Sequence, residues 1–407
     1  TSRLTVTEPR VKLLTHGIRQ REERMTTATT ARMHDLDVPR GLAGVAVAPT
    51  AISDVDGLAG FYHYRGTNPA PLARTTSYED IWFLLHTGEL PTADKSEAFA
   101  DRVRSVATRM PPVLRNALPA IAALGPPGST DVLRTAISAA GVAFGCRTWT
   151  EQDRETTEQQ VLDIASLAHV FAAALYRQAR GLAPVEPSPE LGLAANYLLM
   201  IHGTVPDPER VAALNTYLVL AADHGFCNST FAERVITSSG ADAGAALAGA
   251  IGGLSGPLHG GAIGRVPSML EAIGESSRVE SWITERLNRG ERLRGFGHAV
   301  YQAPDPRTTV LRELAREIGD HRFDLYSYVE RKGIEILNAR KSDKHREANI
   351  ELYAGMVLEW AGIPEELFLS TFAVARMAGW TANYLEQVDN NRIFRPSASY
   401  IGRAPQP

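Results

Sequence analysis

Three histidines lie in glycine-containing segments whose residue types could support chemistry. His224, in "LAADHGFCNST", follows an apolar helical pattern and precedes Gly225. The dipole at a helix C-terminus favours a histidinium, although a capping or core histidine would fit the same sequence. His259, in "GGLSGPLHGGA", lies among glycines whose backbone freedom allows close approach to a ligand, or only a tight turn. Both segments therefore allow a ligand site as well as a structural role.

The third histidine, His298, directly follows "GFG" in "RLRGFGHAVYQAPDPR", and Arg307 begins the next predicted helix. The glycines are expected to leave backbone N–H and C=O groups of this loop accessible. The segment lacks the third glycine and the preceding strand of a dinucleotide-binding fingerprint. We therefore expect a loop that approaches a ligand of another kind.

Two arginines near the C-terminus are candidate anion ligands. Arg376 is the only charge between Leu367 and Leu385, in an apolar helical pattern. A buried arginine needs an anion, because an unpaired buried charge costs on the order of several kcal/mol. That anion is either a protein carboxylate or a ligand carboxylate held by the guanidinium fork. Arg395, in "RIFRPSASYIG", is a weaker candidate because a C-terminal arginine is usually solvated.

One carboxylate, Glu351 in "EANIELYAG", lies at the start of a predicted helix after Asn349. Taken alone it fits an N-terminal helix charge, worth about 0.3–1 kcal/mol. Taken with the three histidines and the arginines, it could instead act as a base. No familiar zinc motif fits the histidine spacings, so we expect no metal and a di- or tricarboxylate as the ligand.

The elements that must position these residues are mainly helices. Apolar residues recur at three- and four-residue spacing in runs such as "VLDIASLAHVFAAALYRQA", "RVAALNTYLVLAADH" and "RTTVLRELAREIG". The segment at residues 41–55 carries β-branched residues and turn formers, so one or two short strands are expected there. The sequence therefore predicts an all-α fold with a short β segment near the N-terminus. A chain of 407 residues suggests two domains, or one large domain with a smaller lobe.

Composition and charge exclude several classes of partner. The formal net charge of −4 is too small to indicate a nucleic-acid or anionic-membrane partner. The two cysteines, Cys146 and Cys227, form no metal-type pair and no disulfide framework, and we expect buried free thiols. The N-terminal segment lacks the apolar stretch of a secretory signal, and residues 1–35 are expected to be a flexible extension. A cytoplasmic location and no membrane span follow as expectations.

In their order and spacing, five segments resemble the citrate synthase family: "ADHGFCNST", "GPLHGGA", "GFGHAVYQAPDPR", "NIELYAG" and "RPSASYIG". The resemblance implies an all-helical homodimer with shared active sites. It implies an extension at 1–35, a large domain at 36–261, a small closing domain at 262–362, and a return to the large domain with a C-terminal arm at 363–407. The implied reaction condenses acetyl-CoA with oxaloacetate and hydrolyses the thioester to citrate and CoA, as in the tricarboxylic acid cycle. No metal and no tightly bound cofactor is implied.

The resemblance also implies roles for individual residues. His259 would stabilise the enol of acetyl-CoA, His298 would polarise and protonate the oxaloacetate carbonyl, and Glu351 would remove the α-proton. The dicarboxylate would be bound by His224, His298, Arg307, Arg376 and, from the partner subunit, Arg395. The adenine of CoA would meet the backbone of Leu293, Arg294, Gly295, Phe296 and Gly297.

The sequence departs from the family at the base, because most members have aspartate where this chain has Glu351. The extra methylene moves the carboxylate by about 1 Å, and such a shift can cost about a hundredfold in rate. Two hypotheses follow. The protein is either a working enzyme that makes citrate, or 2-methylcitrate from propionyl-CoA, or it is a weakly catalytic regulatory protein that binds CoA or dicarboxylates.

Overall fold

The computed structural model describes residues 38–340 and 345–403. The chain divides into two compact units. The main unit comprises residues 50–393, and the terminal unit comprises the described residues on either side, 38–49 and 394–403. The expected extension at residues 1–35 lies outside the described residues.

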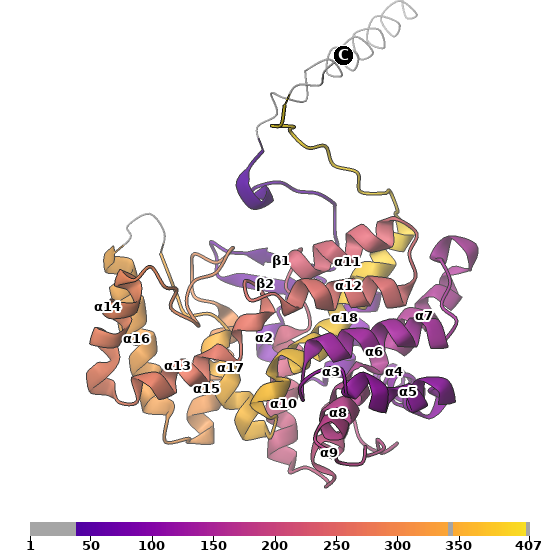
Figure 1. Cartoon of the computed structure of the whole chain (residues 1–407), viewed down its shortest axis with the longest axis horizontal. Coiled ribbons are helices and arrows are strands. Elements are labelled where there is room, and N and C mark those ends of the chain that lie inside the picture. Colours follow the sequence, from indigo (N-terminus) through magenta and orange to yellow (C-terminus); the bar gives the residue numbers. More distant parts are fainter. Residues whose placement is uncertain (1–37, 341–344, 404–407) are drawn as a thin grey trace, which may run out of the picture. The chain divides into compact units, whose positions relative to one another are not determined.

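The main unit is built almost entirely from helices, which confirms the predicted all-α class (Figure 1). Among the described residues, the α-helices up to residue 221 are α2 (Pro69–Leu72), α3 (Tyr78–Thr87), α4 (Ala93–Ser105), α5 (Pro112–Ala122), α6 (Thr130–Ala143), α7 (Arg154–Ser166), α8 (Ala168–Ala179), α9 (Leu193–His202) and α10 (Pro208–Ala221). The remaining ones are α11 (Asn228–Ser238), α12 (Ala243–Ser255), α13 (Arg265–Ile273), α14 (Val279–Asn288), α15 (Pro306–Ile318), α16 (Phe323–Arg340), α17 (Glu351–Ala361) and α18 (Phe368–Asp389).

Local sequence signals set many of these helix ends. Asp207 and Asp242 accept hydrogen bonds from backbone N–H groups in the first turns of α10 and α12. Gly319 and Gly362 end α15 and α17 in the left-handed conformation, which glycine adopts without steric cost. The apolar run at residues 161–179 forms two helices, α7 and α8, because the chain turns at Leu167 between them.

The β segment is a two-stranded antiparallel hairpin of β1 (Ser53–Asp56) and β2 (Phe61–Tyr64). This confirms a short β segment near the N-terminus. The first strand begins at the end of the predicted 41–55 range, and the second lies beyond it. At the start of that range, Gly41 and Gly44 take positive φ angles of 64° and 76° that interrupt an extended strand.

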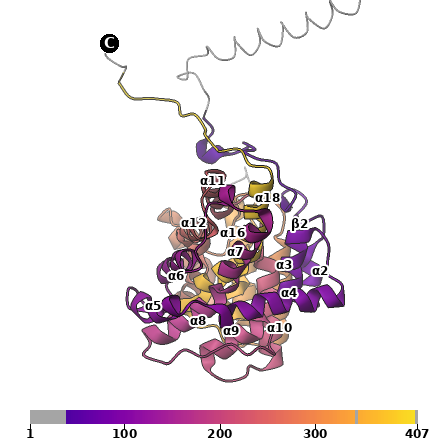
Figure 2. The same ribbon diagram turned by 90° about the vertical axis from the view of Figure 1, so that its right-hand side faces the viewer.

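Helix α18 is the centre of the main unit and carries Arg376. It contacts α3, α7, α8, α10, α11 and α12, and Figures 1 and 2 show it running among these helices. Residues of α18 from Ser370 to Leu385 are buried without interruption. Among the described residues, no helix is both long enough and apolar enough to cross a membrane.

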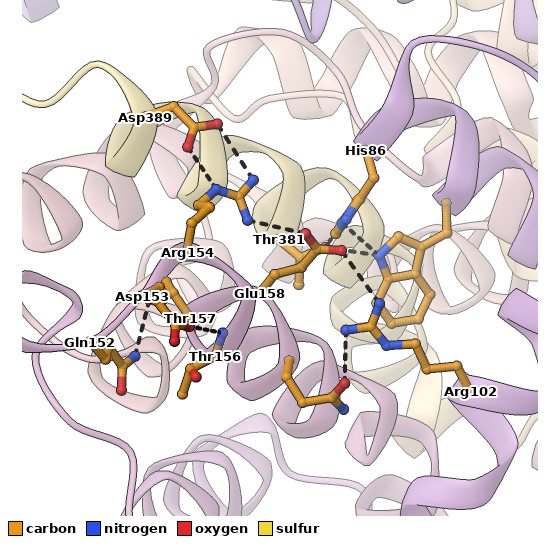
Figure 3. Close-up of polar contacts among 12 residues, drawn as sticks. His86, Arg102, Gln152, Asp153, Arg154, Thr156, Thr157, Glu158, Thr381 and Asp389 are labelled. Carbon is orange, nitrogen blue, oxygen red and sulfur yellow. Dashed lines mark hydrogen bonds and ion pairs between the residues drawn. The ribbon is translucent and has the colours of Figure 1, made fainter.

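Polar side chains fasten the C-terminal end of α18 to α7 (Figure 3). Arg154 donates from Nε to Asp389 at 2.6 Å and from Nη1 to Glu158 at 3.1 Å. Glu158 in turn pairs with Arg102 of α4 at 3.4 Å. The network is partly exposed, so it orients the helices more than it adds stability.

Glycines bring α6 and α12 together. A Cβ atom placed on Gly244 would lie 2.7 Å from the Cα of Gly141 on α6. Any larger residue at either position would therefore push the two helices apart.

Candidate active site

Two of the three candidate histidines lie in direct contact. The rings of His224, after α10, and His298, after the glycine loop, have centroids 5.2 Å apart and are nearly perpendicular at 85°. Tyr301 touches both: its hydroxyl lies 3.1 Å from Nε2 of His224, and its ring centroid lies 4.7 Å from that of His298. The fold thus joins two segments that are far apart in the sequence.

The β hairpin supports the segment that carries His298. The carbonyl of Gly57, in the turn between β1 and β2, accepts the N–H of Gln302 at 2.8 Å. A Cβ atom on Gly57 would lie 2.1 Å from the carbonyl oxygen of Val300. Only glycine therefore allows the hairpin to approach this closely.

The backbone selects the tautomer of His298. Its Nδ1 accepts hydrogen bonds from the N–H groups of Val300 at 3.0 Å and Tyr301 at 3.1 Å. Burial, together with the charge of Arg307, lowers the pKa of His298 to about 4, so the ring is neutral at pH 7. A neutral ring that accepts at Nδ1 carries its proton on Nε2 and can donate there to a ligand.

His224 is also neutral, which corrects the expected histidinium. It is buried, and burial followed by the charges of Arg307 and Arg376 holds the pKa of His224 well below its ordinary value. These effects oppose the helix dipole, which acts here from the end of α10, at Ala221.

Arg307 forms a buried ion pair with Asp305. Nε and Nη2 of the guanidinium donate to the two carboxylate oxygens at 2.9 and 2.7 Å. Asp305 also caps α15 through the N–H of Arg307 and accepts the N–H of Ile350 at 3.3 Å. One aspartate thus fixes both the arginine and the segment that leads into α17.

We expect Asp305→Asn to lower the free energy of unfolding by about 3–5 kcal/mol, because it leaves the Arg307 charge buried and unpaired. Urea unfolding followed by circular dichroism measures this loss. Asp320 pairs with Arg322 through the same atoms, but these side chains are 15% and 33% exposed, against 1% and 3% for Asp305 and Arg307. Asp320→Asn should therefore cost less than about 1 kcal/mol. Equal losses of unfolding free energy in both variants would contradict a special stabilising role for the buried Asp305–Arg307 pair.

Arg376 forms no ion pair in the described part of the chain, although its charge opposes the rise that burial causes in the pKa of the nearby Asp223. It is 2% exposed, its Cζ lies 4.9 Å from the ring centroid of Phe372, and Nη1 lies 3.5 Å from Sγ of Cys227. Its Nε is buried and has no hydrogen-bond partner among the described residues. Of the two anions considered from the sequence, the structure favours one supplied by a ligand.

His259 lies at the end of the loop that follows α12. Its Nε2 is 3.0 Å from Oγ of Ser229 on α11, and its backbone has the unusual angles φ −124° and ψ −117°. After burial and the charge of Arg307, an interaction with His259 also lowers the pKa of both His224 and His298. The third histidine is therefore close enough to act on the other two.

The glycine loop at residues 293–297 is docked on the segment before α17. The N–H of Gly297 donates to the carbonyl of Glu347 at 2.8 Å, and the carbonyl of Gly295 accepts the N–H of Asn349 at 2.9 Å. The side chain of Asn349 donates to the carbonyl of Gly297 at 2.9 Å. The expectation that the loop leaves its backbone groups accessible is therefore wrong for these three groups. Their bonds instead hold the start of α17.

Glu351 is the first residue of α17, and Asn349 already caps its N–H at 3.0 Å. The carboxylate has an environment unlike that of a surface helix charge. Burial raises the pKa of Glu351 to about 7, against the lowering effect of Arg294 and Arg307. A carboxylate with a pKa near 7 suits general base catalysis at neutral pH.

Four residues of the site were not predicted from the sequence. Asp305 could have been found, because Asp before Pro at a helix start is a typical N-cap. The others had no local signal: Tyr62 and Tyr301, whose rings lie 5.8 and 5.9 Å from Cζ of Arg307, and Cys227, whose thiol meets Arg376.

Arg395 belongs to the terminal unit, where its exposed guanidinium donates to the carbonyl of Pro396 at 2.7 Å. It is not among the residues gathered in the main unit. No group of three or more His, Cys, Asp or Glu side chains that could hold a metal ion occurs among the described residues.

Known proteins resemble the chain over nearly its whole length. The model of the citrate synthase C-terminal domain matches residues 41–397. The citrate synthase of Haloferax volcanii is 36% identical over 368 residues, which cover 90% of this chain and 96% of that one. The 2-methylcitrate synthase of Mycobacterium tuberculosis is 35% identical over 374 residues, covering 90% and 91%.

Solved structures of citrate synthases also resemble this chain. The citrate synthase of Thermoplasma acidophilum, solved in a ternary complex with carboxymethyl coenzyme A and oxaloacetate, is 25% identical and superposes with a TM-score of 0.83 over 91% of this chain and 98% of that one. The citrate synthase of Pyrobaculum aerophilum is 32% identical, with a TM-score of 0.78 over 91% and 95%. With the five motifs and the gathered histidines and arginines, these matches show that the chain belongs to the citrate synthase family.

Proposed function

We propose that this protein condenses acetyl-CoA with oxaloacetate and releases citrate and CoA. The observation that carries the proposal is the convergence, in a chain of this family, of His224, His298 and Arg307 with a partly buried carboxylate of raised pKa, Glu351. In class, the enzyme is an acyltransferase that converts the acyl group into an alkyl group on transfer.

Oxaloacetate would bind between the arginines and the neutral histidines. Arg376 offers a guanidinium whose Nε has no hydrogen-bond partner among the described residues, and Asp305 leaves the Nη1 edge of Arg307 for a second carboxylate. The Nε2–H of His298 would donate to the ketone oxygen, which makes the carbonyl carbon more electrophilic. His224, held by Tyr301, would complete the dicarboxylate site.

Acetyl-CoA would react as its enol. Glu351 would take a proton from the α-carbon while His259 hydrogen bonds to the thioester oxygen, which lowers the cost of the developing negative charge. The enol carbon would then bond to the oxaloacetate carbonyl carbon, whose oxygen takes the proton from His298. Attack of water on the thioester would break the carbon–sulfur bond and release citrate and CoA.

The loop at residues 293–297 would hold CoA in a small domain, 262–362, that closes over the substrates. The hydrogen bonds from this loop to residues 347–349 support a coupling between CoA binding and the position of Glu351. The bound coenzyme A analogue and oxaloacetate in the Thermoplasma relative support the substrate classes.

The active form would be a homodimer in the cytoplasm, serving the tricarboxylic acid cycle, with Arg395 reaching the site of the partner subunit. The exposure of Arg395 and its lack of a carboxylate partner in the described chain support this role.

The alternative to acetyl-CoA as the acyl donor is propionyl-CoA. The similarity to a 2-methylcitrate synthase, at 35% identity, equals that to citrate synthases, at 34–36%. Propionyl-CoA differs from acetyl-CoA by one methylene, which a pocket discriminates by only about 1–3 kcal/mol. Overall identity therefore does not separate the two donors.

Thiol release from acetyl-CoA and from propionyl-CoA, each with oxaloacetate, tests the proposal. We expect release with both donors and a larger kcat/KM for acetyl-CoA. A larger kcat/KM for propionyl-CoA would make the protein a 2-methylcitrate synthase. If neither donor releases thiol while oxaloacetate still binds by calorimetry, the protein is a regulatory binder instead.

A further inference from the structure

Cys227 lies inside the candidate active site, although the sequence suggested only a buried free thiol. It is the N-cap residue of the 11-residue helix α11 and remains partly exposed. Its Sγ lies 3.5 Å from Nη1 of Arg376, 3.3 Å from Oγ of Ser229 and 3.4 Å from Oγ1 of Thr230. The sulfur is therefore surrounded by hydrogen-bond donors at the positive end of a helix.

Arg376 provides the independent sign that a ligand belongs beside this sulfur. The side chain is 2% exposed, its Nε has no hydrogen-bond partner among the described residues, and its Nη1 is directed at the sulfur. A buried guanidinium with unused donors favours an anion or a developing negative charge at this place.

A proton path leads away from the thiol. Ser229 connects Sγ of Cys227, at 3.3 Å, to Nε2 of His259, at 3.0 Å. A thiol whose proton can pass to an imidazole is an activated nucleophile. Burial opposes ionisation, but the interaction with His259 and the charge of Arg376 outweigh it, so the pKa of Cys227 lies well below its ordinary value.

The second cysteine lacks all of these features. Cys146 is also free and partly exposed, but burial, with Asp242 and Asp163, raises the pKa of Cys146 to about 12. Cys146 therefore serves as an internal control for the reactivity of Cys227.

We propose that Cys227 is a modification site for hydroperoxides, which oxidise it to a sulfenic acid within the dicarboxylate site. The sulfur attacks one peroxide oxygen, the S–O bond forms, and the O–O bond breaks. The electron pair leaves with the second oxygen, which takes the thiol proton, passed through Ser229 and His259, and becomes water or an alcohol. Sulfur is oxidised by two electrons and the peroxide is reduced.

The modification would block the substrate. The added oxygen lies where Arg376 would receive a substrate carboxylate, so oxidation would inhibit turnover until a thiol reductant restores the cysteine. This consequence rests on the proposed function, whereas the reactivity of the sulfur does not.

Mass spectrometry of the full chain treated with hydrogen peroxide and dimedone, which traps sulfenic acids, tests the proposal. We expect Cys227 to be trapped at least about ten times faster than Cys146, in agreement with their opposite thiol acidities. Ser229→Ala should slow trapping of Cys227 several-fold, and Cys146→Ser should leave it unchanged. Equal trapping of the two cysteines would overturn the proposal.

Citrate serves as the competing ligand, because an α-keto acid such as oxaloacetate would itself consume hydrogen peroxide. Citrate should slow the trapping of Cys227 and leave that of Cys146 unchanged. Trapping that citrate does not slow would overturn the placement of Cys227 in the substrate site. In a thiol-release assay, peroxide should inactivate the unmodified protein reversibly and should not lower further the activity that Cys227→Ser retains. If the protein releases no thiol at all, only the proposed function fails, because the trapping experiment stands without it.

Discussion

Glu351→Gln is expected to lower kcat by about 10²–10⁴-fold, the usual contribution of a positioned general base. Glutamine keeps the shape of the side chain but cannot accept the α-proton. Oxaloacetate binding should persist, because the residues proposed to hold it are unchanged. Thiol release measures turnover, and isothermal calorimetry measures oxaloacetate binding.

Two further variants sharpen this test. Glu359→Gln changes an exposed carboxylate on the same helix, α17, and should leave kcat within about twofold, as surface substitutions generally do. Glu351→Asp withdraws the carboxylate by about 1 Å and should cost about ten- to a hundredfold. If Glu351→Gln turns over like the unchanged protein, Glu351 is a helix charge and not the base.

The pH dependence of kcat/KM should report the protonation of Glu351. Burial raises the pKa of Glu351 to about 7, and the base must be deprotonated to act. Below that pKa, kcat/KM should therefore rise about tenfold per pH unit, and it should level off above pH 7. The residual activity of Glu351→Gln should lack this step.

His298→Ala is expected to lower kcat by about 10²–10³-fold, as the loss of one donor to a developing oxyanion does. The structure assigns the donor to Nε2, because Nδ1 accepts from the backbone at Val300 and Tyr301. Stopped-flow or steady-state thiol release at saturating oxaloacetate measures the effect.

Two replacements of His298 distinguish the role of its hydrogen-bond donor from that of the volume of its ring. His298→Gln retains an N–H donor and should recover part of the lost rate, whereas His298→Ala should not. His321→Ala serves as control, since its side chain is 90% exposed on the surface. Equal losses for glutamine and alanine would show that His298 acts by packing and not through its proton.

Much of the fold was predictable from local patterns. The three- and four-residue apolar spacing predicted the helices that became α10 and α15. A terminal glycine, Gly319, marks the end of α15, whereas α10 ends at Ala221 without one. The limit of such patterns shows at residues 161–179, where one continuous apolar run forms two helices. Apolar residues recur with the same spacing in both helices, so only packing decides where the chain turns between them.

The site was predictable in part, because the residue types follow from the chemistry. Four of the five motifs marked His224, His259, His298, Arg307 and Glu351. An isolated charge in an apolar run marked Arg376. Their ionisation was not predictable in the same way. The dipole argument favoured a charged His224, whereas burial and two neighbouring arginines make it neutral.

The sequence by itself determined the all-helical class, the family and the side chains available for acid–base chemistry. Only the tertiary structure decided that Asp305 pairs with Arg307, that Arg376 forms no ion pair in the described chain, and that Cys227 lies against it. The reason is physical: hydrogen bonding and desolvation act over a few ångströms, and the groups that exert them come from segments that are distant in the sequence.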